Sequence, residues 1–199
     1  NPVASVTAGG PAVTCGSATP SALTLSGSSI GGAETTGTWS IVLGGGNLSN
    51  INPTATPATI TYTPAANYSG IVTLQLATDD PDGAGPCSFA SATRTITINP
   101  QALADAGGPD AACQSATPGA ITLSGASIGG AATTGTWSIL SGGGSLSSTT
   151  PTASPATVTY TPVANYSGSV TLQLITDDPD GAGPCVAVTS TRTINIGTQ

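Results

Sequence analysis

The stretch that decides the fold is residues 66–87, ANYSGIVTLQLATDDPDGAGPC, which returns at residues 164–185 with only two substitutions. Within it, Val72, Leu74 and Leu76 alternate with polar residues, which is the period-two pattern of a strand with one buried and one solvated face. The NYSG segment before this strand predicts a turn, and the DDPDG segment after it predicts a loop that ends the strand. The stretch therefore indicates a β-sandwich strand inside an internal repeat.

The repeat extends over the whole sequence. A shift of 98 residues aligns 69 of 98 positions identically and without a gap. In a chain of 199 residues, this predicts two domains, residues 1–98 and 99–199. The sequence begins at a repeat boundary, so we expect a processed product or a segment of a longer tandem array.

Each repeat is predicted to be all-β. Turn signals separate about seven strand-like segments per repeat, which is the profile of an immunoglobulin-like β-sandwich, and no helix is expected. In the first repeat the expected strands are residues 3–7, 22–25, 38–43, a short edge strand at Leu48, residues 59–63, the strand through Val72, and residues 93–98. Trp39 and Trp137, one per repeat, are expected to fill the core between the sheets, the alternative being an exposed platform for sugar stacking.

Charge is sparse and acidic. The chain has nine acidic residues, two arginines, no lysine and no histidine, for a net charge of −7. Nucleic acid and anionic membrane surfaces both require clustered basic residues, so neither is an expected partner. No apolar run approaches the roughly 20 residues of a membrane span. Arg94 and Arg192 are each expected to pair with a carboxylate.

Two cysteines per repeat predict disulfide bonds. The equivalence of the repeats favours Cys15 with Cys87 and Cys113 with Cys185. A bridge of that loop length would contribute about 4 kcal/mol and indicates an oxidising, extracytoplasmic location. Bridges between repeats or subunits, and free buried thiols, remain alternatives. The spacing lacks the paired ligands of a zinc site.

An acidic loop ends the deciding stretch in each repeat. Several carboxylates in one tight loop could bind calcium, which takes 6 to 8 oxygen ligands. The preferred alternative is a solvated turn capped by its own aspartates. The possible calcium ligands are Asp79, Asp80 and Asp82 and their counterparts Asp177, Asp178 and Asp180, with Asp105 and Asp110 expected near the junction of the repeats.

No motif predicts catalysis. The paired carboxylates lack a basic partner, and no serine has a base to activate it, so an enzyme is not expected. Asn47, Asn67 and Asn165 lie in Asn-x-Ser sequons and are possible glycosylation sites, although Asn67 and Asn165 could instead serve their turns.

One long segment of each repeat resembles modules of a known kind: TITYTPAANYSGIVTLQLATDDPDGAGPC in the first and TVTYTPVANYSGSVTLQLITDDPDGAGPC in the second. The short motifs GTWS and TRTI, present in each repeat, fit the same resemblance. They are similar to the tandem immunoglobulin-like and PKD-like repeats of bacterial surface proteins, most of all those of the Bacteroidetes. The resemblance implies a secreted stalk, adhesin or fibre-forming protein exported with a cleaved signal, and it transfers no site residue. The chain lacks the DxNDN-type linker of calcium-dependent relatives.

Together these features predict a non-enzymatic, extracellular structural protein, a subunit or segment of a cell-surface fibre or stalk. Self-association is expected, since similar domains in series form an open, repeating interface. The alternative is an adhesin-type module that recognises a glycan or a host surface through its loops.

Overall fold

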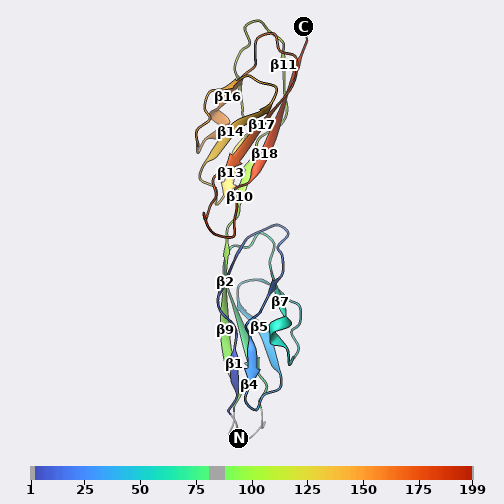
Figure 1. Cartoon of the computed structure of the whole chain (residues 1–199), viewed down its shortest axis with the longest axis vertical. Helices are drawn as coiled ribbons and strands as arrows, with labels where there is room; N and C mark the ends of the chain where they lie inside the picture. The colour runs from blue at the N-terminus through green and yellow to red at the C-terminus, as the bar shows by residue number, and fades with distance from the viewer. Residues whose placement is uncertain (1–2, 81–87, 199) are drawn as a thin grey trace. The chain divides into compact units, whose positions relative to one another are not determined.

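The computed structural model describes residues 3–80 and 88–198. The chain forms two compact units, Asn1–Pro100 and Gln101–Gln199. Each is an immunoglobulin-like β-sandwich, which confirms the predicted fold class (Figure 1). Two positions of the predicted sites, Asp82 and Cys87, lie outside the described residues.

The first unit has two main sheets. One has the strand order β2-β9-β8-β5 and the other β3-β7-β6, while β1 pairs separately with β4. The strands are β1 (Ser5–Thr7), β2 (Ala12–Cys15), β3 (Leu23–Thr24), β4 (Ser29–Gly31), β5 (Gly37–Leu43), β6 (Gly46–Leu48), β7 (Thr61–Pro64), β8 (Gly70–Thr78) and β9 (Ser91–Asn99).

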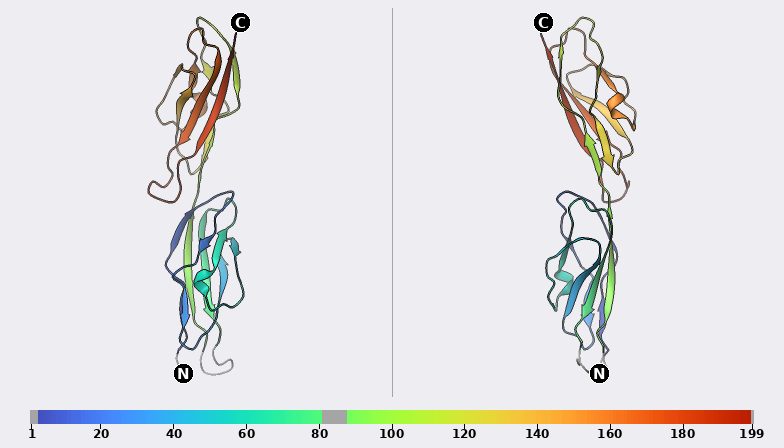
Figure 2. Two further views of the ribbon diagram at one scale, coloured as in Figure 1. Left: turned by 45° about the vertical axis from the view of Figure 1, so that its right-hand side comes forward. Right: turned by 180° about the vertical axis from the view of Figure 1, so that it is seen from behind.

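The second unit repeats this topology. Its sheets have the orders β11-β18-β17-β14 and β12-β16-β15, with β10 paired to β13 (Figure 2). The strands are β10 (Ala102–Asp105), β11 (Asp110–Cys113), β12 (Ile121–Thr122), β13 (Ser127–Gly130), β14 (Gly135–Ser141), β15 (Ser145–Leu146), β16 (Thr159–Thr161), β17 (Gly168–Thr176) and β18 (Thr189–Gly197).

The core of each unit lies between the two sheets. In the first unit, Val72, Leu74 and Leu76 of β8 are completely buried, as their alternation predicts. Burying each such side chain contributes about 1.5–3 kcal/mol. Trp39 of β5 lies beside them with 1% of its surface exposed, and its indole N–H donates a hydrogen bond of 3.1 Å to the carbonyl of Pro57. Trp137 and Pro155 make the same contact in the second unit.

The observed strands differ from the predicted ones at the start of each repeat. The first predicted strand, residues 3–7, is β1, and a strand that was not predicted, β2, follows a break at Gly9, where φ is +82° and a Cβ would lie 2.8 Å from the carbonyl oxygen of Ser26. Before the break, β1 pairs with β4, and after it β2 pairs in parallel with β9. The two strands that were not predicted, β2 and β4, bring the count from about seven to nine in the described part of the first unit, and the second unit has nine as well.

One predicted strand is shorter than expected. Pro57–Thr59 forms a single turn of 3-10 helix, so the strand predicted over residues 59–63 begins at Thr61. Proline favours such a turn because its φ is fixed near the helical value. Pro155–Thr157 does the same in the second unit.

Candidate functional site

Each repeat has two poles, and the candidate site residues lie at one or the other. We call the end where β9 or β18 begins the N-terminal pole, and the end where that strand finishes the C-terminal pole. The amide of Ala106, just after β10, donates a hydrogen bond of 3.0 Å to Ser190 Oγ near the start of β18, so the second unit begins at its N-terminal pole. The chain leaves at the opposite pole, where β18 ends at Gly197.

The acidic loop of the second repeat lies at the N-terminal pole, and Asp177 fixes its start. Asp177 Oδ1 accepts hydrogen bonds of 2.9 Å from the amides of Thr133 and Thr134, while Oδ2 accepts one of 2.5 Å from the Thr133 hydroxyl. The bonds from the Thr133 hydroxyl and the Thr134 amide are the main reasons why the pKa of Asp177 is lowered. The carboxylate therefore joins the β13–β14 loop to the end of β17.

The other two aspartates of this loop bond to the loop itself. Asp178 Oδ1 accepts hydrogen bonds from the amides of Asp180, at 3.3 Å, and Gly181, at 3.1 Å. Asp180 Oδ2 accepts one of 3.2 Å from the amide of Cys185. These contacts cap the turn, as expected from the preferred alternative to calcium binding, a solvated turn capped by its own aspartates.

The matching loop start in the first repeat keeps one of these partners, since Thr36 corresponds to Thr134, and adds a different one, Glu34. Asp79 Oδ1 accepts a hydrogen bond of 3.3 Å from the amide of Thr36. Desolvation raises the pKa of Asp79, but the hydrogen bonds with the Thr36 amide and the Glu34 side chain outweigh it, so the pKa is lowered. Glu34, only 7% exposed, corresponds in the aligned sequence to Ala132 of the second repeat.

Residues 3–80 and 88–198 contain no group of three or more His, Cys, Asp or Glu side chains that could hold a metal ion. Two aspartates expected near the repeat junction have local partners. Asp105 Oδ1 accepts a hydrogen bond of 2.8 Å from the amide of Gly107, and Asp110 pairs with Arg192.

The predicted pairing of Cys113 with Cys185 is wrong. Cys113 is a free, exposed thiol, whereas Cys15 and Cys185 are disulfide-bonded. Cys113 lies opposite Gly197 at the C-terminal pole, and Cys185 precedes the start of β18 at the other pole. The length of β18 between them is about 26 Å at roughly 3.3 Å per residue. A disulfide requires Cα atoms within about 7 Å, so the fold excludes this bridge within the repeat.

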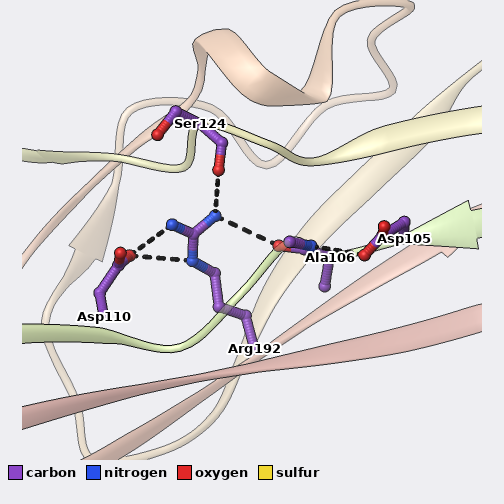
Figure 3. A network of polar contacts seen from close by, with 6 residues as sticks. Asp105, Ala106, Asp110, Ser124 and Arg192 are labelled. Carbon is purple, nitrogen blue, oxygen red and sulfur yellow. Dashed lines mark hydrogen bonds and ion pairs between the residues drawn. The ribbon is translucent and has the colours of Figure 1, made fainter.

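A buried arginine centre holds the second repeat together, and Figure 3 shows its contacts. Arg192, 3% exposed, donates from Nε and Nη2 to Asp110 Oδ2, at 2.9 and 2.5 Å. Its Nη1 donates to the carbonyls of Ala106, at 3.2 Å, and Ser124, at 2.8 Å. The predicted arginine–carboxylate pair is therefore present in this repeat and links β18, β11 and the loop after β12.

The first repeat has the arginine without the carboxylate. Ala12 corresponds to Asp110, with the same register against the last strand. Arg94 Nη1 donates a hydrogen bond of 2.9 Å to the Ser26 carbonyl, and its Nε has no hydrogen-bond partner. Burial lowers the pKa of Arg94. The prediction that Arg94 pairs with a carboxylate is not met among the described residues.

A shallow groove recurs between β5 and β6 in the first repeat and between β14 and β15 in the second. The volumes are about 680 and 590 Å³. Each pair of strands forms the free edges of the two sheets. In the first repeat the lining includes Trp39, Asn47, Asn50, Ile51 and Asn52. Sequence reasoning missed this groove, because it arises from two sheet edges meeting and not from a motif.

The three sequon asparagines are exposed, but they differ in backbone conformation. Asn67 and Asn165 have φ of 57° and 59°, and their amides donate to the carbonyls of Ser17 and Ser115 at 2.8 Å. Asparagine tolerates this left-handed conformation better than most residues. Both therefore serve their turns, while Asn47 lies on β6. Glycosylation of all three stays a prediction.

Comparisons with known proteins support the fold. No protein-family model matches the chain, and no curated protein sequence matches it. Among solved structures, the crystal structure of Drosophila N-cadherin EC1-4 is similar with a TM-score of 0.54 and 9% identity, covering 99% of this chain and 49% of that chain. Human CDH23 EC21-23 is similar with a TM-score of 0.50 and 13% identity, covering 98% and 64%. The chain thus spans about half of the N-cadherin fragment and shares its fold of tandem β-sandwiches. No helix of the described residues is long and apolar enough to cross a membrane.

Proposed function

We propose that the chain is a non-enzymatic, load-bearing segment of an extracellular stalk or fibre that associates with further copies of itself. The observation that carries the proposal is the parallel pairing of an early strand with the last strand of each repeat. In the first repeat β2 pairs with β9, and in the second β11 pairs with β18. The chain enters each repeat at one pole and leaves at the other, so tension along the chain passes through this pair.

The geometry of the pair suits tension. A force applied at the two ends pulls parallel strands past each other in shear, so their hydrogen bonds carry the load together. An antiparallel hairpin pulled at its open end breaks its bonds one at a time. In the first repeat the pair continues past β2, where the amide of Gly16 donates to the carbonyl of Asn99 at 2.7 Å, and Gln114 and Gly197 do the same at 2.8 Å in the second.

The polar residues support a structural role as well. The described aspartates of the second acidic loop bond to backbone amides, and Arg192 bonds to Asp110 and to carbonyls. These contacts stabilise loops and strands and leave no positioned acid, base and nucleophile among the described residues. Disulfide-bonded Cys15 and Cys185 are typical of proteins exported to an oxidising compartment. The resemblance to bacterial surface repeats points to the same setting.

Single-molecule force unfolding tests the proposal, with the chain held at its two ends. Gly16→Pro removes the amide that bonds to Asn99, while the control Ser49→Pro removes an amide that bonds to Thr61 at 2.9 Å, away from the terminal strands. Each change is expected to cost about 1 kcal/mol in chemical unfolding. Only Gly16→Pro is expected to lower the unfolding force of the first repeat. An equal effect of both variants on the force would refute a load-bearing pair.

The second candidate is an adhesin-type module that recognises a glycan or a cell surface. The groove between β5 and β6 favours it, since a groove recurs in both repeats and each is lined by hydroxyl side chains beside Trp, Ile and Leu, with asparagine amides added in the first repeat. Trp39 is 1% exposed, so it offers no stacking face to a sugar ring. Binding to a glycan array that is abolished by Asn50→Ala and Asn52→Ala would establish this function. If the array shows no binding, the structural role is the one that stands.

A further inference from the structure

The buried arginine of the first repeat lacks the anionic partner that its counterpart has. In the second repeat, Arg192 donates hydrogen bonds from Nε and Nη2 to Asp110 and from Nη1 to two carbonyls. In the first repeat, Arg94 is 8% exposed, and the described residues offer it one hydrogen bond, from Nη1 to the Ser26 carbonyl. Its Nε is buried and has no hydrogen-bond partner in the described part of the chain. Buried charges are normally paired, so this cation is a candidate to bind an anion.

The surroundings of the two guanidinium groups otherwise match. Ala12 takes the register of Asp110 against the last strand of its sheet. A Cβ on Gly9 would lie 3.0 Å from Arg94 Nη1, and a Cβ on the equivalent glycine of the second repeat would lie 2.8 Å from Arg192 Nη1. Each Nη1 also donates to an equivalent serine carbonyl, at 2.9 and 2.8 Å. Arg94 has therefore not moved into the place that the Asp110 carboxylate occupies in the second repeat.

The contact of Arg192 with Asp110 indicates what this place can hold. Nε and Nη2 both donate to the same atom, Asp110 Oδ2, at 2.9 and 2.5 Å. Two N–H groups that converge on one atom need a single, small acceptor. The Asp110 side chain keeps 27% of its surface exposed, so this place lies close to solvent. Ala12 is likewise only partly buried, on the strand β2 at the edge of its sheet.

We propose that the first repeat binds a small monovalent anion, chloride or a simple carboxylate such as formate, at the Nε–Nη2 edge of Arg94 beside Ala12. The ion takes the place of the Asp110 carboxylate oxygen and completes the charge pair that the second repeat forms with its own side chain. Sulfate is disfavoured, because a divalent anion loses more hydration free energy when it is buried. The inference goes beyond the load-bearing role and does not depend on it.

Binding at this place stabilises only the folded first repeat. Burial lowers the pKa of Arg94, because its charged form has lost hydration. An anion that replaces this lost hydration binds the folded state and not the unfolded chain, so it stabilises the fold by mass action. A dissociation constant on the order of 50 mM would slow the exchange of amides that open only on unfolding about 4-fold at about 150 mM chloride.

Hydrogen exchange of the whole chain tests the site, measured by mass spectrometry in sodium chloride and in sodium sulfate at equal ionic strength. The second repeat is identical to the first at 69 of 98 aligned positions and carries its own carboxylate, so it reports the general effect of each salt. After this correction, we expect amides of β8 and β9 to exchange about 4-fold more slowly in chloride than in sulfate.

Three variants locate the effect. Ala12→Asp places a carboxylate beside Arg94 and should remove the chloride dependence of the first repeat. Val13→Asp is the matched control, because it adds the same charge at the neighbouring position, where Val13 is 54% exposed on the other face of β2, and it should keep the dependence. Asp110→Ala should give the second repeat a chloride dependence like that of the first. If this variant does not fold, the comparison of the two first-repeat variants decides.

Crystals of the chain grown in sodium bromide give a direct readout. We expect an anomalous bromide peak beside Arg94 Nε and none beside Arg192. A water molecule at that place, equal chloride dependence of the two repeats, no chloride dependence in either, or a dependence that survives Ala12→Asp would each overturn the inference. The force experiment compares backbone hydrogen bonds away from this site, so the proposed function can fail or stand separately.

Discussion

Replacing Ala12 by aspartate is expected to stabilise the first repeat. Ala12 and Asp110 have the same register, opposite Ile96 and Ile194, and the arginine they face is buried in both repeats. In the second repeat Arg192 Nε donates to Asp110, whereas Arg94 Nε has no hydrogen-bond partner. Ala12→Asp supplies the missing acceptor in a backbone that already accommodates it.

The expected gain follows from the energy of a charged hydrogen bond. Such bonds contribute about 1.5–3 kcal/mol, against which stands the cost of desolvating the new carboxylate. Asp110 keeps 27% of its side-chain surface exposed, so that cost is partial. After that cost is subtracted, the net gain is at most about 1.5–3 kcal/mol, which corresponds to at most roughly 10- to 150-fold slower exchange of amides that open only on unfolding.

Hydrogen exchange of the whole chain, measured by mass spectrometry of its peptides, gives the amide exchange rates of the two repeats separately. Amides of β8 and β9 should exchange more slowly in Ala12→Asp, while those of β17 and β18 stay unchanged. The reciprocal variant, Asp110→Ala, should accelerate exchange in β17 and β18 and give the second repeat the arginine environment of the first. Unchanged exchange in both variants would refute the assignment of stability to this ion pair.

Three further predictions concern the loops and the core. Hydrogen bonds from Thr133 and Thr134 lower the pKa of Asp177 in the folded chain. The ionised carboxylate therefore stabilises the fold fully at any pH above the unfolded pKa of about 3.9. This stabilisation is lost as the pH falls through the lower pKa of the folded state. In acid unfolding followed by circular dichroism, the stability of Asp177→Asn should therefore fall less steeply with decreasing pH than that of the unmodified chain. An identical pH dependence in the two proteins would contradict this effect. A chelator should leave the calorimetric unfolding midpoint unchanged, because Asp177, Asp178 and Asp180 already accept backbone hydrogen bonds. A midpoint that rises with added calcium would instead show that the loop binds calcium. Trp39→Phe removes the indole donor, so that the Pro57 carbonyl keeps only the hydrogen bond of 3.3 Å from the Ile60 amide. With the smaller side chain in the core, this should cost about 1–3 kcal/mol in urea unfolding, and Trp137→Phe about the same. A cost near zero in both would show that the indole is dispensable.

The acidic loop shows how far local sequence reasoning reaches. The cluster of Asp, Pro and Gly predicts a tight turn, and the alternative of aspartates capping their own loop matches the contacts of Asp178 and Asp180. The contact of Asp177 with Thr133 and Thr134 spans more than 40 residues. Nothing in the local pattern gives that partner, because it depends on which loops the sheets bring to the same pole.

The repeat, the all-β class and the buried face of the central strand can all be predicted from the amino-acid sequence. These follow from alternation, turn residues and self-similarity, which are local properties of the chain. The state of the cysteines and arginines depends on contacts between segments that are distant in the sequence. The split at Gly9 directs β2 to pair in parallel with β9, which carries Cys15 to the C-terminal pole. The equivalence of the repeats could not predict how far apart the cysteines of one repeat lie. It relates positions along the chain and contains no information on the distance between the two ends of a sandwich.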